Sequence, residues 1–169
     1  MAVREVLVFP DARLKEVSAE VNIGDDIELR QILEDLKDTL ESSPGCTGIA
    51  APQLDIRKRI VIIDATRARK PNDNHGRLFL INPVIESTSG SATAREGCLS
   101  VPDLTGNVTR AESITVDFVD ENGTANQINA SGFEARLIQH EIDHLDGYLF
   151  IDRVTCLKTD VFRRKRFDG

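Results

Sequence analysis

Cysteine and aromatic residues are scarce in this chain of 169 residues, and long apolar runs are absent. It contains no tryptophan, one tyrosine and three cysteines, at positions 46, 98 and 156. Three cysteines cannot all pair within one chain, and their spacing gives no disulfide framework, so we expect a reducing, cytoplasmic location. No apolar segment is long enough to cross a bilayer, and a membrane partner is therefore not expected. The apolar N-terminus is interrupted by charge and by Pro10, which is unlike a signal peptide.

Basic side chains are in the minority as well. The chain has 21 lysines and arginines against 28 aspartates and glutamates, a formal net charge of -7. Proteins dedicated to duplex DNA are normally basic, so we expect no DNA partner. Residues 157–169 differ, with five basic and two acidic side chains. The composition, 40% hydrophobic and 29% charged, is typical of a soluble globular protein, and the length fits a single domain over residues 1–169.

Two segments near the N-terminus have the periodicity of amphipathic helices. Five aliphatic residues recur at i, i+3, i+4, i+7 and i+11, which predicts a helix over residues 26–42. Asp25 and Glu28 resemble a capping box at its start. A shorter helix before it is expected to place Leu14 and Val17 on one side.

The middle of the chain alternates in the manner of strands. Asn122-Gly123 is a hairpin turn signal, and the polar stretch 66–77 is interpreted as a mobile loop in which His75 is solvated. Cys156 is expected to pack in the interior. Strands before and after helices favour an α+β fold. The predicted strands cover residues 59–64, 78–81, 113–120 and 125–129.

A helix predicted over residues 133–146 carries the sequence HExxH. On a helical wheel of about 100° per residue, His140, His144 and Glu141 share one face with four aliphatic residues. Side chains at i and i+4 lie one turn apart, so both imidazoles can bind one metal ion. Glu141 faces the open side of that ion, where it can accept a proton from water. An ordinary amphipathic helix is the alternative, but HExxH is unexpected by chance in a chain with three histidines.

Two histidines leave the metal short of a ligand, and the third ligand decides the enzyme class. The extended metzincin pattern fails because Phe150 occupies its third histidine position, and no glutamate follows Glu141. A zinc endopeptidase is therefore disfavoured, although a downstream aspartate (Asp146, Asp152 or Asp160) remains possible. Cys98, in the Gly-flanked sequence EGCLS, is the stronger candidate because a thiolate is a better ligand than those carboxylates. Taken alone, Cys98 would be read as a small buried residue.

Three separated segments resemble the peptide deformylase family. They are Gly48-Ile-Ala-Ala-Pro-Gln53, Glu96-Gly-Cys-Leu-Ser100 and Gln139-His-Glu-Ile-Asp-His144, in matching order and spacing. The resemblance covers nearly the whole chain. It implies a metal enzyme that removes the formyl group from the N-terminal methionine of nascent polypeptides. It also implies an α+β domain whose antiparallel sheets pack around the central HExxH helix.

The resemblance assigns a role to each residue of the site. Cys98, His140 and His144 are expected to hold one divalent ion, Fe2+ physiologically, with Zn2+, Ni2+ or Co2+ able to replace it. Hydroxide would attack the formyl carbon while Glu141 carries the proton. The Gln53 amide and the Leu99 backbone N–H are expected to stabilise the oxyanion. Substrate contacts are expected from Gly48, Ile49, Gly97 and Leu137.

Two positions depart from the family pattern, and the role of the basic C-terminal cluster has two interpretations. Cys46 replaces the first glycine of the family's GxGxAAxQ sequence, where it is either a partly buried small residue or a redox partner of Cys98. Thr105 occupies a position at which members often carry an arginine that holds the peptide, and the nearest base is Arg110. The basic cluster at 163–166 is interpreted either as a ribosome contact or as a solvated chain end.

Overall fold

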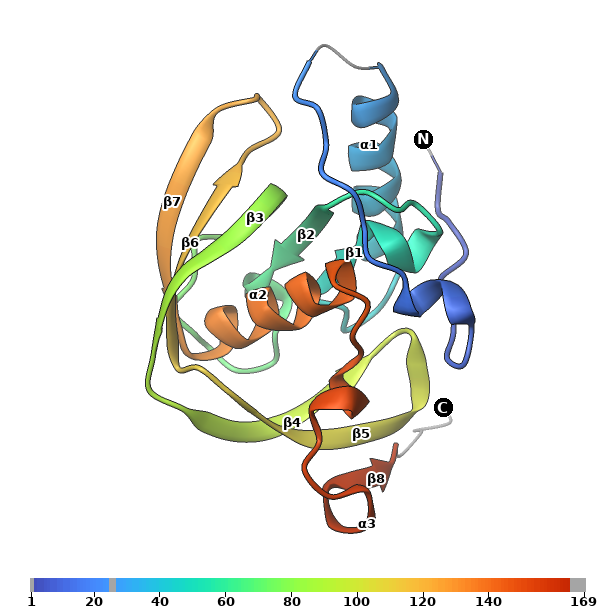
Figure 1. The fold of residues 1–169 in the computed structure, drawn as a ribbon, viewed down its shortest axis with the longest axis vertical. Coiled ribbons are helices and arrows are strands. Elements are labelled where there is room, and N and C mark those ends of the chain that lie inside the picture. Colours follow the sequence, from blue (N-terminus) through green and yellow to red (C-terminus); the bar gives the residue numbers. More distant parts are fainter. Residues whose placement is uncertain (1, 25–26, 165–169) are drawn as a thin grey trace.

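Two antiparallel sheets lie on either side of one central helix in the computed structural model (Figure 1), which describes residues 2–24 and 27–164. In chain order, its elements are η1 (Ala12–Lys15), α1 (Ile27–Glu41), β1 (Gly48–Ala50), η2 (Ala51–Leu54), β2 (Ile60–Asp64), η3 (Ala65–Arg67), β3 (Arg77–Ser89), β4 (Ala92–Cys98), β5 (Val101–Arg110), β6 (Ser113–Val119), β7 (Ala125–Ser131), α2 (Gly132–Leu145), η4 (Phe150–Arg153), α3 (Leu157–Asp160) and β8 (Val161–Arg163).

The strands divide into a larger and a smaller sheet. The five-stranded sheet has the order β1-β2-β3-β6-β7, and the three-stranded sheet has the order β4-β5-β8. All of these pairings are antiparallel. The helix α2 lies between the sheets (Figure 1), so its side chains can reach both of them. The predicted α+β class, with antiparallel sheets around this helix, is confirmed.

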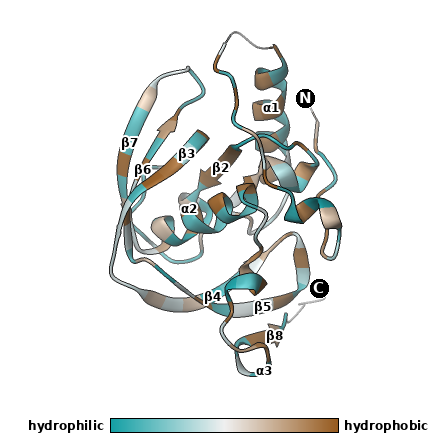
Figure 2. Ribbon diagram, in the orientation of Figure 1, coloured by the Kyte–Doolittle hydropathy of each residue, from teal (hydrophilic) through white to brown (hydrophobic). Residues whose placement is uncertain are grey.

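The core forms on both faces of the larger sheet. Every residue of β2 is buried, and this strand is coloured apolar along most of its length in Figure 2. Its alternate side chains therefore serve two clusters. Val61 and Ile63 pack with Leu137 and Ile138 of α2. The opposite face of β2 packs against the buried stripe of α1.

Most of the predicted elements are present. The helix expected over 26–42 runs from Ile27 to Glu41, although Asp25 of its capping box lies outside the described residues. The strands at 59–64, 113–120 and 125–129 correspond to β2, β6 and β7. The strand expected to end at Ile81 instead continues to Ser89, with a register shift after Ile81 and a left-handed φ of 51° at Asn82. The irregularity accommodates Asn82-Pro83 within the strand, whereas the sequence suggested that the strand ends at this pair.

Two smaller predictions were wrong. Leu14 is buried, but Val17 is 70% exposed and does not share its environment. Cys156 is exposed instead of packed. In the loop expected to be mobile, the backbone N–H of His75 donates to Glu134 at 2.7 Å, and its Nδ1 lies 2.5 Å from the same carboxylate. His75 is exposed, as expected, and these contacts with the buried Glu134 also tie it to the start of α2.

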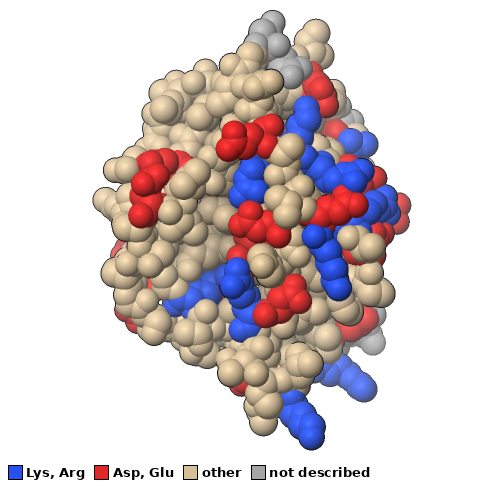
Figure 3. Space-filling view, viewed as in Figure 1, with Lys and Arg blue, Asp and Glu red and all other residues tan. Residues whose placement is uncertain are grey.

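Charges of both signs share the surface. In Figure 3, acidic and basic side chains intermingle on the α1 side of the molecule, while the β6–β7 side carries fewer charged side chains, among them an acidic group. None of the helices in the described part of the chain is long and apolar enough to span a membrane.

Candidate metal centre and active site

The helix α2 supplies the two histidines of the candidate metal centre. His140 and His144 lie one turn apart, and their ring centroids are 5.2 Å apart with the rings edge to face. Both are buried, together with the aliphatic residues of the same helix. The predicted inward face of α2 is therefore present, and it directs both imidazoles toward the end of β4.

Cys98, the last residue of β4, completes the cluster. Its Sγ lies 3.4 Å from His144 Nε2, and the ligand atoms of Cys98, His140 and His144 all lie within 4.8 Å of one another. Burial alone would raise the pKa of the Cys98 thiol, but the imidazoles of His144 and His140 hold it well below its usual value. A thiolate beside two imidazoles is a donor set suited to a divalent transition-metal ion.

Glu96 orients His140 from behind. One carboxylate oxygen lies 2.8 Å from His140 Nδ1, which leaves Nε2 facing the cluster. Arg110 and Arg136 also bond to this carboxylate. Burial opposes ionisation of Glu96, but His140 and Arg110 overcome it and hold the pKa at about 2. A carboxylate in this position fixes the tautomer of a metal-binding histidine.

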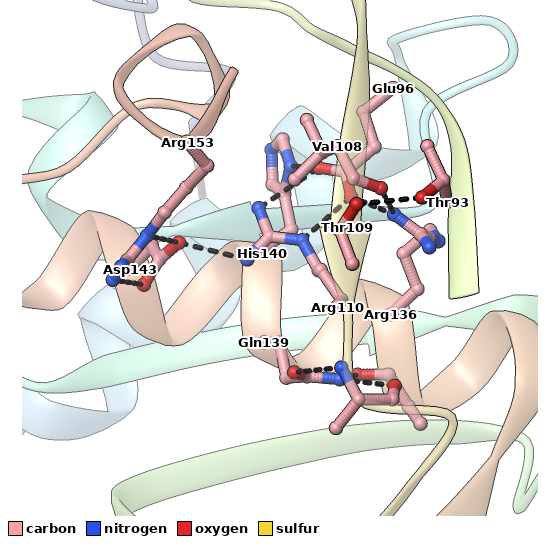
Figure 4. A network of polar contacts seen from close by, with 12 residues as sticks. Thr93, Glu96, Val108, Thr109, Arg110, Arg136, Gln139, His140, Asp143 and Arg153 are labelled. Carbon is pink, nitrogen blue, oxygen red and sulfur yellow. Dashed lines mark hydrogen bonds and ion pairs between the residues drawn. The ribbon is translucent and has the colours of Figure 1, made fainter. Parts of the chain in front are cut away.

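The hydrogen-bond network continues along the side of α2 that faces the smaller sheet (Figure 4). Arg110 joins Glu96 to Asp143, and Arg153 contacts the other oxygen of Asp143. Gln139 exchanges hydrogen bonds with the backbone of Ala111. The polar side of α2 therefore faces protein and not water, which the helical wheel alone could not distinguish.

Glu141 is buried beside the cluster without a full set of partners. Its Oε1 lies 3.7 Å from His140 Nε2, and its Oε2 has no hydrogen-bond partner among the described residues. Burial raises the pKa of this carboxyl group. A buried oxygen without a partner is costly, so this atom is suited to bind a reacting molecule.

Gln53 reaches the cluster from η2. Its Oε1 accepts a hydrogen bond from the Ala50 N–H at 2.9 Å. Its Nε2 donates to Ser100 Oγ at 2.9 Å and lies 3.5 Å from Cys98 Sγ. The amide is thereby held in one orientation. Leu99, whose backbone N–H was the other predicted oxyanion donor, lines the adjoining cavity.

A cavity of about 1030 Å³ opens beside the cluster. Gly48, Gly97 and Leu137 line it, as expected of substrate-binding residues, but Ile49 does not. The Ile49 side chain is fully buried against α1, so only its backbone could meet a substrate. Packing around Gly48 is tight: a Cβ there would lie 3.0 Å from Leu137 Cδ1 and 3.2 Å from Glu141 Cγ.

The two departures from the family pattern have different structural outcomes. Cys46 is buried at the cavity wall, with its Sγ 3.3 Å from the Gly48 carbonyl, as expected of a small packed residue. Burial, reinforced by the charge of Glu141, raises its pKa to about 12. Arg110 does not replace the arginine missing at Thr105, because it is buried in the ion-pair network.

Sequence reasoning missed the supporting residues of the site. Glu96 was recognised only as part of a motif, although a carboxylate near a metal-binding histidine is a recurring arrangement. Arg164 and Phe133 line the cavity, but the sequence indicated only a basic cluster for Arg164 and a helix start for Phe133. Arg164 reaches the cavity only because β8 pairs with β5, a contact between distant parts of the chain.

Comparisons with known proteins agree with this geometry. A family model described as Polypeptide deformylase matches residues 3–160. A peptide deformylase of Xylella fastidiosa (strain M12) is 39% identical over 167 residues, which cover 98% of this chain and 95% of that protein.

Solved structures are similar over most of the chain. The crystal structure of a peptide deformylase from Legionella pneumophila has a TM-score of 0.83 at 36% identity, covering 93% of this chain and 89% of that chain. A Met-Ala-Ser-bound class I type b peptide deformylase from Acinetobacter baumannii has a TM-score of 0.84 at 33% identity, covering 90% and 100% respectively.

Proposed function

The chain belongs to the polypeptide deformylase family, and we propose on this basis the catalytic roles of its site residues. It is a metal-dependent hydrolase that removes the formyl group from the N-terminal methionine of nascent polypeptides. One observation carries this function: Cys98 and the two imidazoles converge beside Glu141 on the wall of a cavity.

Cys98, His140 and His144 would hold one divalent ion. One thiolate and two imidazoles suit Fe2+, the ion proposed for the physiological enzyme, and also Zn2+, Ni2+ or Co2+. When bound, the ion supplies Lewis acidity, which lowers the pKa of water. Glu96 keeps His140 in the tautomer that presents Nε2.

Glu141 acts as the proton carrier. Its unpartnered Oε2 accepts a proton from the attacking water and then delivers it to the departing amine. Burial raises the pKa of the Glu141 carboxyl group. The higher pKa favours uptake of the proton from water and its delivery to the amine, because it brings the proton affinity of Glu141 closer to those of these two groups.

Gln53 and Leu99 stabilise the charge that develops on the formyl oxygen. The proposed donors are the Gln53 side-chain amide and the Leu99 backbone N–H. Gln53 accepts a hydrogen bond from the Ala50 N–H and donates one to Ser100, and these bonds support this role because they fix the amide before the reaction begins.

Gly48, Gly97, Leu137 and the backbone of Ile49 form the substrate side of the site. The bound peptide of the Acinetobacter protein, Met-Ala-Ser, is what formyl-Met-Ala-Ser becomes when it loses its formyl group. We therefore place formylmethionyl peptides in the cavity beside these residues.

Formate release from formyl-Met-Ala-Ser, measured with anaerobically purified protein of known metal content, tests the function. Stoichiometric iron with rapid formate release is expected. A zinc endopeptidase would instead cleave internal peptide bonds, and a metal-binding module without catalysis would do neither. Either of these outcomes would contradict the proposal.

The basic C-terminal segment is proposed to contact ribosomal RNA in the cytoplasm, where nascent chains emerge. Its excess of basic side chains supports this contact; Lys165 and Arg166 lie outside the described residues. A variant with Arg163, Lys165 and Arg166 changed to Gln should lose salt-sensitive co-sedimentation with ribosomes. Unchanged co-sedimentation would refute the contact.

A further inference from the structure

Arg164 is held beside the candidate active site by the smaller sheet. It directly follows β8, which pairs with β5 through Thr105 and Phe162. Its own backbone N–H donates to the Asp103 carbonyl at 2.8 Å. The backbone at Arg164 is therefore fixed relative to β4 and β5, although it lies more than 60 residues away from Cys98 along the chain.

The side chain of Arg164 extends from this anchor across Gly97. A Cβ built on Gly97 would lie 2.1 Å from one guanidinium nitrogen of Arg164 and 3.2 Å from Cζ, closer than real side chains approach. The same Cβ would lie 3.5 Å from Thr105 Cγ2. A glycine at position 97 and a short side chain at position 105 thus leave room for the guanidinium, one residue from Cys98.

The positive charge of the Arg164 guanidinium is not paired with any acidic side chain in the described part of the chain. No ion pair or side-chain hydrogen bond joins it to residues 2–24 or 27–163. Neighbouring arginines differ: Arg136 bonds to Glu96, and Arg95 stacks on Phe162 with its Cζ 3.7 Å from the ring centroid. Arg164 lines the cavity with Gly97, so its N–H donors are available to a ligand there.

We propose that Arg164 binds the substrate peptide downstream of its formylmethionine, through a backbone carbonyl or a terminal carboxylate oxygen. This inference rests on the proposed function and adds a residue that selects the peptide. An extended chain advances about 3.3 Å per residue. A peptide whose first residue lies at Cys98 therefore brings the oxygens of its next two residues within reach of a guanidinium at Gly97.

The test compares Arg164→Gln and Arg164→Lys with Arg30→Gln, a control at an exposed arginine of α1 that does not line the cavity. Substrates are formyl-Met-Ala-Ser as the free acid and as the C-terminal amide, and thermal melts verify folding. For Arg164→Gln, KM should rise about tenfold with kcat nearly unchanged, because one charge-assisted hydrogen bond is lost. Lysine should restore part of the affinity, and Arg30→Gln should behave as the parent protein.

The two substrates identify the oxygen that is bound. A rise in KM for the acid alone indicates the terminal carboxylate, and an equal rise for acid and amide indicates a backbone carbonyl. An unchanged or lower KM in Arg164→Gln would overturn the proposal, since the side chain would then only cover Gly97. Absence of formate release from the parent protein would instead refute the proposed function.

Discussion

Glu141 is buried, and its Oε2 has no hydrogen-bond partner among the residues that the structure describes. Removing such an oxygen from water without a new partner is energetically costly. Such an atom is retained more readily where a reacting molecule supplies the missing partner. Glu141→Gln preserves the shape but cannot carry the proton, so kcat should fall about 10²–10⁴-fold. Metal content should remain stoichiometric, as measured on anaerobically purified protein. A variant that keeps near-normal kcat would remove Glu141 as the proton carrier.

Gln53 has two tasks that mutation can separate. Its Oε1 closes the turn at Ala50, and its Nε2 faces Ser100 and Cys98. Loss of an oxyanion donor typically lowers kcat about 10²–10³-fold, and we expect this for Gln53→Ala with the metal retained. Gln127→Ala, at an exposed position, is the matched control. A metal-free Gln53→Ala protein would show that Gln53 supports the ligands instead.

Cys46 sits at the cavity wall, but its thiol is poorly suited to redox chemistry. Burial and the nearby carboxylate of Glu141 raise its pKa to about 12, and the thiolate is the reactive form. Cys46→Ser should therefore be inactivated by peroxide at the same rate as the parent protein, as followed by residual formate release. Marked protection by the serine would instead support a disulfide between Cys46 and Cys98.

At the scale of elements, buried ion pairs hold α2 against the smaller sheet. Arg110 bridges Glu96 and Asp143, and all three are buried. Arg110→Met removes the partner shared by two buried carboxylates, although Glu96 keeps Arg136 and Asp143 keeps Arg153. The free energy of unfolding should fall by as much as about 3–5 kcal/mol. Arg153, the other partner of Asp143, has a side chain that is 46% exposed. Arg153→Met should therefore lower the free energy of unfolding by less than about 1 kcal/mol.

Urea denaturation at neutral pH measures both variants. Equal losses for Arg110→Met and Arg153→Met would mean that burial of the network contributes nothing to its importance. A large loss for Arg110→Met alone would show that the ion pairs fix α2 against β5, and with it the position of His140.

The local sequence predicted α2 and the position of its two histidines on one face. Helical spacing places residues i and i+4 one turn apart, whatever the helix packs against. The hairpin of β4 and β5 was not predicted, since β4 has the sequence ATAREGC with little apolar alternation. Its order depends on cross-strand pairing and on Arg136, which bonds to the Ala92 carbonyl. For side chains such as Glu96 and Arg164, which reach the site through distant contacts, the local sequence does not predict this position.

For the whole molecule, the three proposed ligands come from two different layers of the fold. Cys98 ends a strand of the smaller sheet, whereas the histidines belong to the helix that packs on the larger sheet. An ion bound to all three therefore links the two halves of the fold. Binding that is specific to the folded state stabilises it by mass action.

Chelation should consequently remove both activity and stability. With metal at about 100 times its Kd, its loss costs about 2.7 kcal/mol, and the melting temperature should fall by about 5–10 °C. Calorimetry and formate release before and after chelation measure both effects, and returned Zn2+ should restore the melting temperature. Cys98→Ser, which weakens the site, should show a much smaller response. An equal response in that variant would place the stabilising metal elsewhere, because the link between the sheets depends on this thiolate.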